Sequence, residues 1–208
     1  MNLKNKPLIY WLGGSTCAGK TTISNALAAK YGVTVYHCDE YLGQHIEKSN
    51  ELEHPNLNKI ANASWDDILS MNVGNYLNWT TASFSEEFEM ILEDLDQLPD
   101  DKPIVVEGIN LLPRLIKEKL VDINQAVWLV ADETFYKNHQ MKRKGLFERI
   151  SECSNPDQAL QNYMNDDLAF GKYVLDETIK LALNVIEIAN ESDMEKNIEL
   201  ISSYFNLV

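Results

Sequence analysis

The chain has 208 residues, 45% of them hydrophobic, and a formal net charge of −14. This length suits one substantial globular domain, and the apolar content excludes an intrinsically disordered chain. The negative charge argues against nucleic acid or an anionic membrane as a partner, because both would repel the protein. Three cysteines without paired spacing are typical of a reducing compartment, so we expect a cytoplasmic protein, either monomeric or homodimeric.

A phosphate-binding pattern follows the first predicted strand. Residues 8–12 form an apolar run that indicates a buried strand and is too short to span a membrane. Residues 14–21 read Gly-Ser-Thr-Cys-Ala-Gly-Lys-Thr, which fits the phosphate-loop pattern G-x-x-x-x-G-K-[ST], and a helical apolar pattern follows. We expect Lys20 to reach the phosphates of a nucleoside triphosphate and the Thr21 hydroxyl to bind Mg²⁺. The predicted nucleotide-binding residues are Gly14, Ser15, Thr16, Cys17, Ala18, Gly19, Lys20, Thr21 and Thr22.

A carboxylate ends the second predicted strand. Residues 33–37 read as a strand that runs into Cys38-Asp39-Glu40. Ligands of open α/β sheets bind beyond the carboxyl ends of the strands, so Asp39 is a candidate general base or ligand of a Mg²⁺-bound water. The alternative is that Asp39 or Glu40 only caps the helix that follows.

A long, mostly helical insertion covers about residues 40–102. We expect a weak helix over 46–52 that Pro55 breaks, a helix capped by Ser64, and a clear amphipathic helix over 83–98. Parallel strands need only a dozen or so connecting residues, so the excess indicates a binding role. Five aromatic residues either line a pocket or belong to the core: Tyr41, Trp65, Tyr76, Trp79 and Phe84. Of these, Tyr41 is our candidate for contact with the substrate.

A third predicted strand, residues 104–107, ends in Glu107-Gly108. A buried strand followed by an acid has the character of a Walker-B segment, in which the carboxylate faces Mg²⁺ and its waters. We therefore expect Glu107 to serve the metal together with Thr21; the alternative is a structural acid that binds backbone amides. Arg114 follows shortly afterwards and is a candidate substrate contact.

Basic residues cluster after the fourth predicted strand, residues 125–130. Asp132 is a good helix start, and the segment 137–149 contains two of the three arginines of the chain, Arg143 and Arg149. Arginine suits bidentate phosphate contacts, so we expect these two side chains to close over the transferred phosphate. A solvated basic helix face is the alternative interpretation.

The remaining pattern completes an α/β fold. A helix begins near Asn155 and runs towards Lys180, residues 183–188 indicate a fifth strand, and a last helix ends near Phe205. Five strands that alternate with helices predict a three-layer α/β/α sandwich with a mostly parallel sheet. We see no domain break, so residues 1–208 are predicted to form one domain.

In these motifs and their order, the chain resembles the P-loop kinases of small molecules. Val-Val-Glu-Gly-Ile-Asn-Leu-Leu at 105–112 is most similar to uridine and pantothenate kinases and to 2-phosphoglycerate-kinase-like proteins. The resemblance implies a five-stranded parallel sheet of order 2-3-1-4-5, a lid at about 133–153 and an acceptor-binding region in the insertion. Kinases of nucleoside monophosphates hold the acceptor phosphate with arginines in that region, and residues 40–102 here contain none.

The sequence thus predicts an ATP- and Mg²⁺-dependent phosphotransferase that acts on a hydroxyl of a small metabolite. In this hypothesis Lys20, Asp39, Arg143 and Arg149 carry the chemistry. Alternatives are a nucleotide-hydrolysing switch, which transfers phosphate only to water, and a nucleoside or nucleotide kinase.

Overall fold

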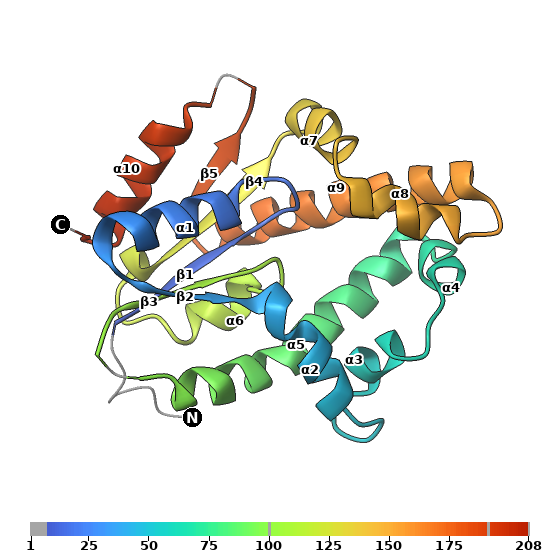
Figure 1. The fold of residues 1–208 in the computed structure, drawn as a ribbon, viewed down its shortest axis with the longest axis horizontal. Helices are drawn as coiled ribbons and strands as arrows, with labels where there is room; N and C mark the ends of the chain where they lie inside the picture. Colours follow the sequence, from blue (N-terminus) through green and yellow to red (C-terminus); the bar gives the residue numbers. More distant parts are fainter. Residues whose placement is uncertain (1–7, 100, 191, 208) are drawn as a thin grey trace.

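A five-stranded parallel sheet forms the centre of the protein, as seen in a computed structural model that describes residues 8–99, 101–190 and 192–207 (Figure 1). The strands are β1 (Ile9–Gly14), β2 (Thr34–His37), β3 (Ile104–Glu107), β4 (Ala126–Ala131) and β5 (Asn184–Ile188). Their order in the sheet is β2-β3-β1-β4-β5, and every neighbouring pair is parallel. The predicted topology is therefore confirmed.

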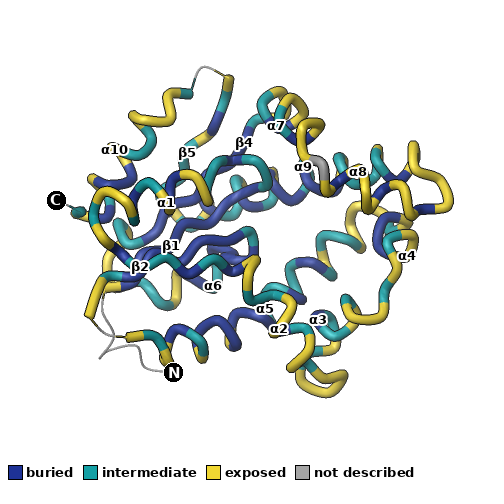
Figure 2. Tube along the Cα trace, in the orientation of Figure 1, coloured by how far each residue is buried: buried dark blue, intermediate teal, exposed yellow. Residues whose placement is uncertain are grey.

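Helices cover both faces of the sheet, because alternate residues of each strand point to opposite sides. Tyr10 and Leu12 belong to an apolar cluster with α1 (Lys20–Tyr31) and α10 (Met194–Tyr204), here called the second cluster. Ile9 and Trp11 point the other way, into the first cluster, which contains side chains of α5 (Val73–Gln97), α6 (Pro113–Lys117) and α9 (Pro156–Lys180). The three central strands, β1, β3 and β4, are consequently buried at every residue (Figure 2).

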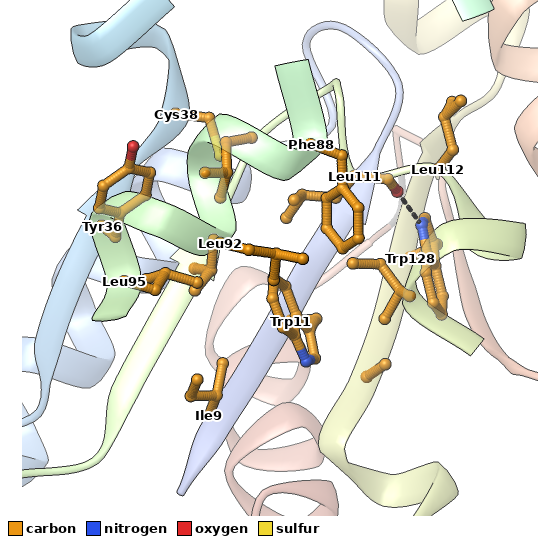
Figure 3. Close-up of a cluster of buried hydrophobic side chains, with 14 of the residues drawn as sticks. Ile9, Trp11, Tyr36, Cys38, Phe88, Leu92, Leu95, Leu111, Leu112 and Trp128 are labelled. Atoms are coloured by element: carbon orange, nitrogen blue, oxygen red, sulfur yellow. Dashed lines mark hydrogen bonds between the residues drawn. The ribbon is translucent and has the colours of Figure 1, made fainter. Parts of the chain in front are cut away.

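Trp128 is a central side chain of the first cluster and is held there by a hydrogen bond (Figure 3). Its ring is fully buried, and its indole N–H donates a 2.8 Å hydrogen bond to the Leu111 carbonyl, so the polar atom is satisfied inside the core. The same ring needs Gly13, since a Cβ at that position would lie 2.3 Å from the indole nitrogen.

The remaining helices are α2 (Cys38–Lys48), α3 (Pro55–Ile60), α4 (Trp65–Leu69), α7 (Glu133–Gln140) and α8 (Lys144–Ser151), with a 3₁₀ turn, η2 (Ile123–Gln125). The expected helix over 46–52 is wrong: α2 begins directly after β2 and ends at Lys48, and Pro55 starts a helix instead of only ending one. The expected helix over 83–98 begins ten residues earlier, because the Asn72 side chain caps it by accepting from the Asn75 N–H. Ser64 caps α4 with a capping box, as predicted.

A third apolar cluster lies away from the sheet, where α4, α8 and the start of α9 meet (Figure 1). Its buried members are Ile68, Leu69, Leu146, Ile150, Cys153 and Ala159. Trp65, Tyr76 and Trp79 pack against this cluster, whereas Tyr41 and Phe84 pack against the first cluster. The aromatic residues of the insertion therefore serve mainly as core. No helix in the described part of the chain is both long and apolar enough to cross a membrane.

Candidate active site

The phosphate-binding loop connects β1 to α1 and depends on two glycines. Gly14 has a φ of +134°, and a Cβ there would lie 1.9 Å from the Leu129 carbonyl oxygen, so no larger residue fits. Gly19, with a φ of +86°, ends the loop directly before the first turn of α1. The free N–H groups of this helix start and the loop amides make an anion-binding site.

Lys20 folds back over this loop. Its ammonium donates to the Ser15 carbonyl at 2.8 Å and lies 3.4 Å from the Gly14 carbonyl. Burial lowers the pKa of Lys20, while the carboxylates of Glu107 and Asp39 act in the opposite direction. The three charged groups therefore face one another across the mouth of the loop.

Glu107, the last residue of β3, contacts Thr21 in the first turn of α1. The Thr21 hydroxyl donates a 3.0 Å hydrogen bond to Glu107 Oε1, and Glu107 is only 5% exposed. The ring of His37 lies 2.7 Å from the same oxygen through Nδ1. Sequence reasoning missed His37, although its position at the end of β2, directly beside Glu107 in the strand register, was the available signal. A hydroxyl and a buried carboxylate in contact are suited to Mg²⁺ that also binds phosphate oxygens and water.

One pocket of about 360 Å³ brings most of the predicted site residues together. It is lined by residues 16–22 of the loop, Asp39, Glu107, Ile109, His139 and Arg143. Asp39 lies in the exposed first turn of α2, so its carboxylate is free to meet a second ligand beside the phosphates. The charge of Arg143, at the start of α8, acts on both Lys20 and Cys17.

Besides Gly14 and Ser15 of the loop, three predicted residues lie outside this pocket. The Arg149 guanidinium stacks over the ring of Trp65 at 5.1 Å. Arg114 donates to the hydroxyls of Tyr173 and Ser85 and so links α6, α9 and α5. The ring of Tyr41 stacks on that of Tyr36 at 4.3 Å.

The loop also contacts the middle of α9 through a pair of acids that sequence reasoning missed. Asp167 accepts from the Thr16 hydroxyl at 3.2 Å and from the Tyr136 hydroxyl of α7 at 2.8 Å, and burial raises its pKa to about 6. Burial and the neighbouring Asp167 raise the pKa of Asp166 to about 7. Among the residues that the structure describes, neither carboxylate oxygen of Asp166 has a hydrogen-bond partner. The only hint of these two acids in the sequence was two consecutive aspartates within the predicted helix that became α9.

Comparison with known structures identifies the fold. A Thermus thermophilus protein of known crystal structure matches with a TM-score of 0.54 and 16% identity, over 98% of this chain and 99% of that one. Shikimate kinase from Bacteroides thetaiotaomicron matches with a TM-score of 0.53 and 15% identity, over 96% of this chain and 99% of that one. The fold is that of the P-loop small-molecule kinases.

One curated protein extends this likeness to the sequence. The chain is 21% identical over 194 residues to 2-phosphoglycerate kinase of Methanocaldococcus jannaschii. The match covers 90% of this chain but 60% of that protein, so the chain spans less than two thirds of its relative's length. No family model matches the chain.

Proposed function

We propose that the protein transfers the γ-phosphoryl group of ATP to a hydroxyl of a small metabolite. The observation that carries this proposal is the single pocket in which the phosphate loop, Asp39, Glu107 and Arg143 meet. Phosphoryl transfer requires a loop that binds the phosphates, carboxylates that serve the metal and the acceptor, and a cationic side chain that neutralises the transferred group. The phosphate loop, Glu107 with Asp39, and Arg143 match these requirements.

In this proposal the nucleotide is held by the loop amides, the start of α1 and Lys20. Thr21 and Glu107 would hold Mg²⁺, which supplies charge neutralisation on the phosphate oxygens when bound. The 3.0 Å contact between Thr21 and Glu107 supports this assignment. His37 would orient the Glu107 carboxylate through its 2.7 Å contact with the same oxygen.

Asp39 is the group we propose to orient the acceptor hydroxyl and take its proton. The acceptor oxygen forms a bond with the γ-phosphorus, the bond to the bridging oxygen breaks, and ADP leaves. Arg143 would stabilise the charge that spreads over the transferring group. Arg149, which we expected beside it, is engaged by Trp65 and is not assigned to this step.

The acceptor that fits best is uncharged or weakly charged. Residues 40–102 contain no arginine, and Arg114 is engaged by Tyr173 and Ser85. Few cations are therefore left for a second phosphate or carboxylate. Shikimate and 2-phosphoglycerate, the acceptors named for a structural neighbour and for the curated relative, are the first anionic compounds to test against this expectation.

The test is release of ADP from Mg·ATP with and without pooled hydroxyl metabolites and nucleosides. We expect strong stimulation by one pool, and Asp39→Asn should abolish the stimulation while leaving binding of a fluorescent ATP analogue intact. Lys20→Ala should lose both. Steady hydrolysis that is indifferent to every pool would replace this proposal with the nucleotide-hydrolysing switch.

A further inference from the structure

The predicted lid is not a free flap, because its two helices are anchored to different parts of the protein. The buried side chains of α8, Leu146 and Ile150, belong to the third cluster together with Ile68 and Leu69 of α4. Neither Leu146 nor Ile150 belongs to either cluster of the sheet. The apolar face of α8 is therefore buried against α4 of the acceptor insertion and the start of α9.

Polar contacts flank this apolar seam. Asp66, in the first turn of α4, accepts two contacts from the Ser154 backbone N–H at 3.0 and 3.1 Å, and one from its hydroxyl at 2.6 Å. Arg149 of α8 covers the ring of Trp65, the first residue of α4, at 5.1 Å. Charge-assisted hydrogen bonds and a cation–π contact on one five-residue helix dock it in a fixed orientation.

The other lid helix, α7, is tied to the nucleotide side. Tyr136 lies in the second cluster and donates to Asp167, which in turn accepts from Thr16 of the phosphate loop. Gln140, at the end of α7, accepts a 2.9 Å hydrogen bond from the Cys17 thiol of the same loop. Gln140 also donates to the Tyr163 hydroxyl of α9 at 3.2 Å, so α7 is held between the phosphate loop and α9.

Arg143 lies at the joint between these two anchored helices. Residues 141–143 separate α7 from α8 and are exposed, and Arg143 has extended backbone angles, φ −83° and ψ 108°. Because α7 is held at the phosphate loop and α8 is held in the third cluster, a rotation of α8 relative to α7 would change the backbone angles of residues 141–143. The side chain that lines the phosphate pocket is thus the one that such a rotation moves.

We propose that Asp66 and Arg149 are positioning residues that fasten the lid helix α8 to the acceptor insertion, so that the state of the insertion sets the position of Arg143. This inference rests on the proposed function for its catalytic consequence. In the structure α8 is docked and Arg143 lines the phosphate pocket, so the docking would hold Arg143 at the γ-phosphate. Loosening α8 would displace Arg143 and admit water, which favours hydrolysis over transfer.

The docking itself is tested without any activity measurement, by limited trypsin digestion of the full chain. Cleavage after Lys142 and Arg143 requires local release of the lid, because a protease needs an extended segment. We expect Asp66→Ala to speed this cleavage about five- to tenfold, and Trp65→Leu, which keeps an apolar side chain but removes the partner of Arg149, to speed it less. Glu148→Ala, at an exposed acid of α8, is the matched control and should not change the rate.

The catalytic consequence is tested with the acceptor found in the activity screen. Asp66→Ala should lower kcat for transfer several-fold, leave the KM for ATP unchanged and raise the ratio of hydrolysis to transfer. Unchanged lid cleavage in Asp66→Ala, with unaltered thermal unfolding, would overturn the docking. Faster cleavage with an unchanged hydrolysis-to-transfer ratio would overturn the coupling to Arg143. If no acceptor stimulates the wild type, only the proposed function fails, and the cleavage result still decides the docking.

Discussion

Replacing Asp166 with asparagine should stabilise the protein, and the gain should depend on pH. Asp166 is 1% exposed, and neither of its oxygens has a hydrogen-bond partner among the described residues. Burial therefore disfavours its charged form, and the adjacent Asp167 carboxylate adds to this, so that the pKa rises to about 7. Asparagine has nearly the same shape as the protonated acid and carries no charge.

The magnitude follows from proton linkage. The folded carboxyl binds its proton more tightly than the unfolded one, whose pKa is 3.8, so the free energy of unfolding falls as pH rises between these values. A shift of about 3 units corresponds to about 4 kcal/mol at 1.36 kcal/mol per unit, which is an upper limit because Asp167 titrates nearby. We expect a gain of about 2–4 kcal/mol above pH 7, declining towards pH 4.

Urea unfolding of wild type and Asp166→Asn at pH 5, 6, 7 and 8 measures this difference. Asp167→Asn is the matched control on the same helix turn: its carboxylate accepts from Thr16 and Tyr136, so the amide loses partners and should gain less or destabilise. A gain for Asp166→Asn that is the same at every pH, or a loss at pH 8, would refute the reasoning.

Three further predictions concern the loop, the insertion and the metal. Gly14→Ala should lower the free energy of unfolding by about 3 kcal/mol or more, because its Cβ would meet backbone, whereas Gly43→Ala in α2, where nothing lies within 4 Å, should stabilise by about 0.5–1 kcal/mol in the same urea titration. His45→Ala should cost about 3–5 kcal/mol, since it leaves the buried Glu87 carboxylate without its 3.0 Å partner. Burial alone would lower the pKa of His45, but Glu87 and Asp94 raise it overall above 6.5, so this stabilisation is complete below that pH and is lost as pH rises through the folded pKa. Thr21→Ala should raise the Mg²⁺ concentration needed for half-maximal ADP release at least about tenfold, and Thr21→Ser should restore it; an unchanged requirement in Thr21→Ala would count against the metal assignment.

The parts of the fold that could be predicted are those set by local chemistry. The spacing of Gly14, Gly19 and Lys20 and the apolar run before them located the loop, because only that order of strand, turn and helix satisfies the loop backbone. The sheet order followed from the resemblance and not from the residues alone. The start of α5 was missed because its first turns contain Gly74 and the β-branched Thr80 and Thr81, which are weak helix formers, and because they depend on the Asn72 cap.

The parts of the site that were missed depend on contacts distant in sequence. Asp167 meets Thr16 across 151 positions, and nothing near either residue signals the contact. Arg149 lies six residues from Arg143 and looked equivalent to it in the sequence. In the structure they have different surroundings: Arg143 lines the phosphate pocket, whereas Arg149 covers the ring of Trp65.

The division of the core into separate clusters gives the molecule two built-in optical probes. Of its four tryptophans, Trp11 and Trp128 lie in the first cluster under the sheet, and Trp65 and Trp79 pack against the third cluster between insertion and lid. Fluorescence from the first pair follows melting of the sheet, whereas emission from the second pair follows separation of α4 from α8. Variants that keep one pair and carry phenylalanine at the other would let stopped-flow mixing time the two events independently in the same protein.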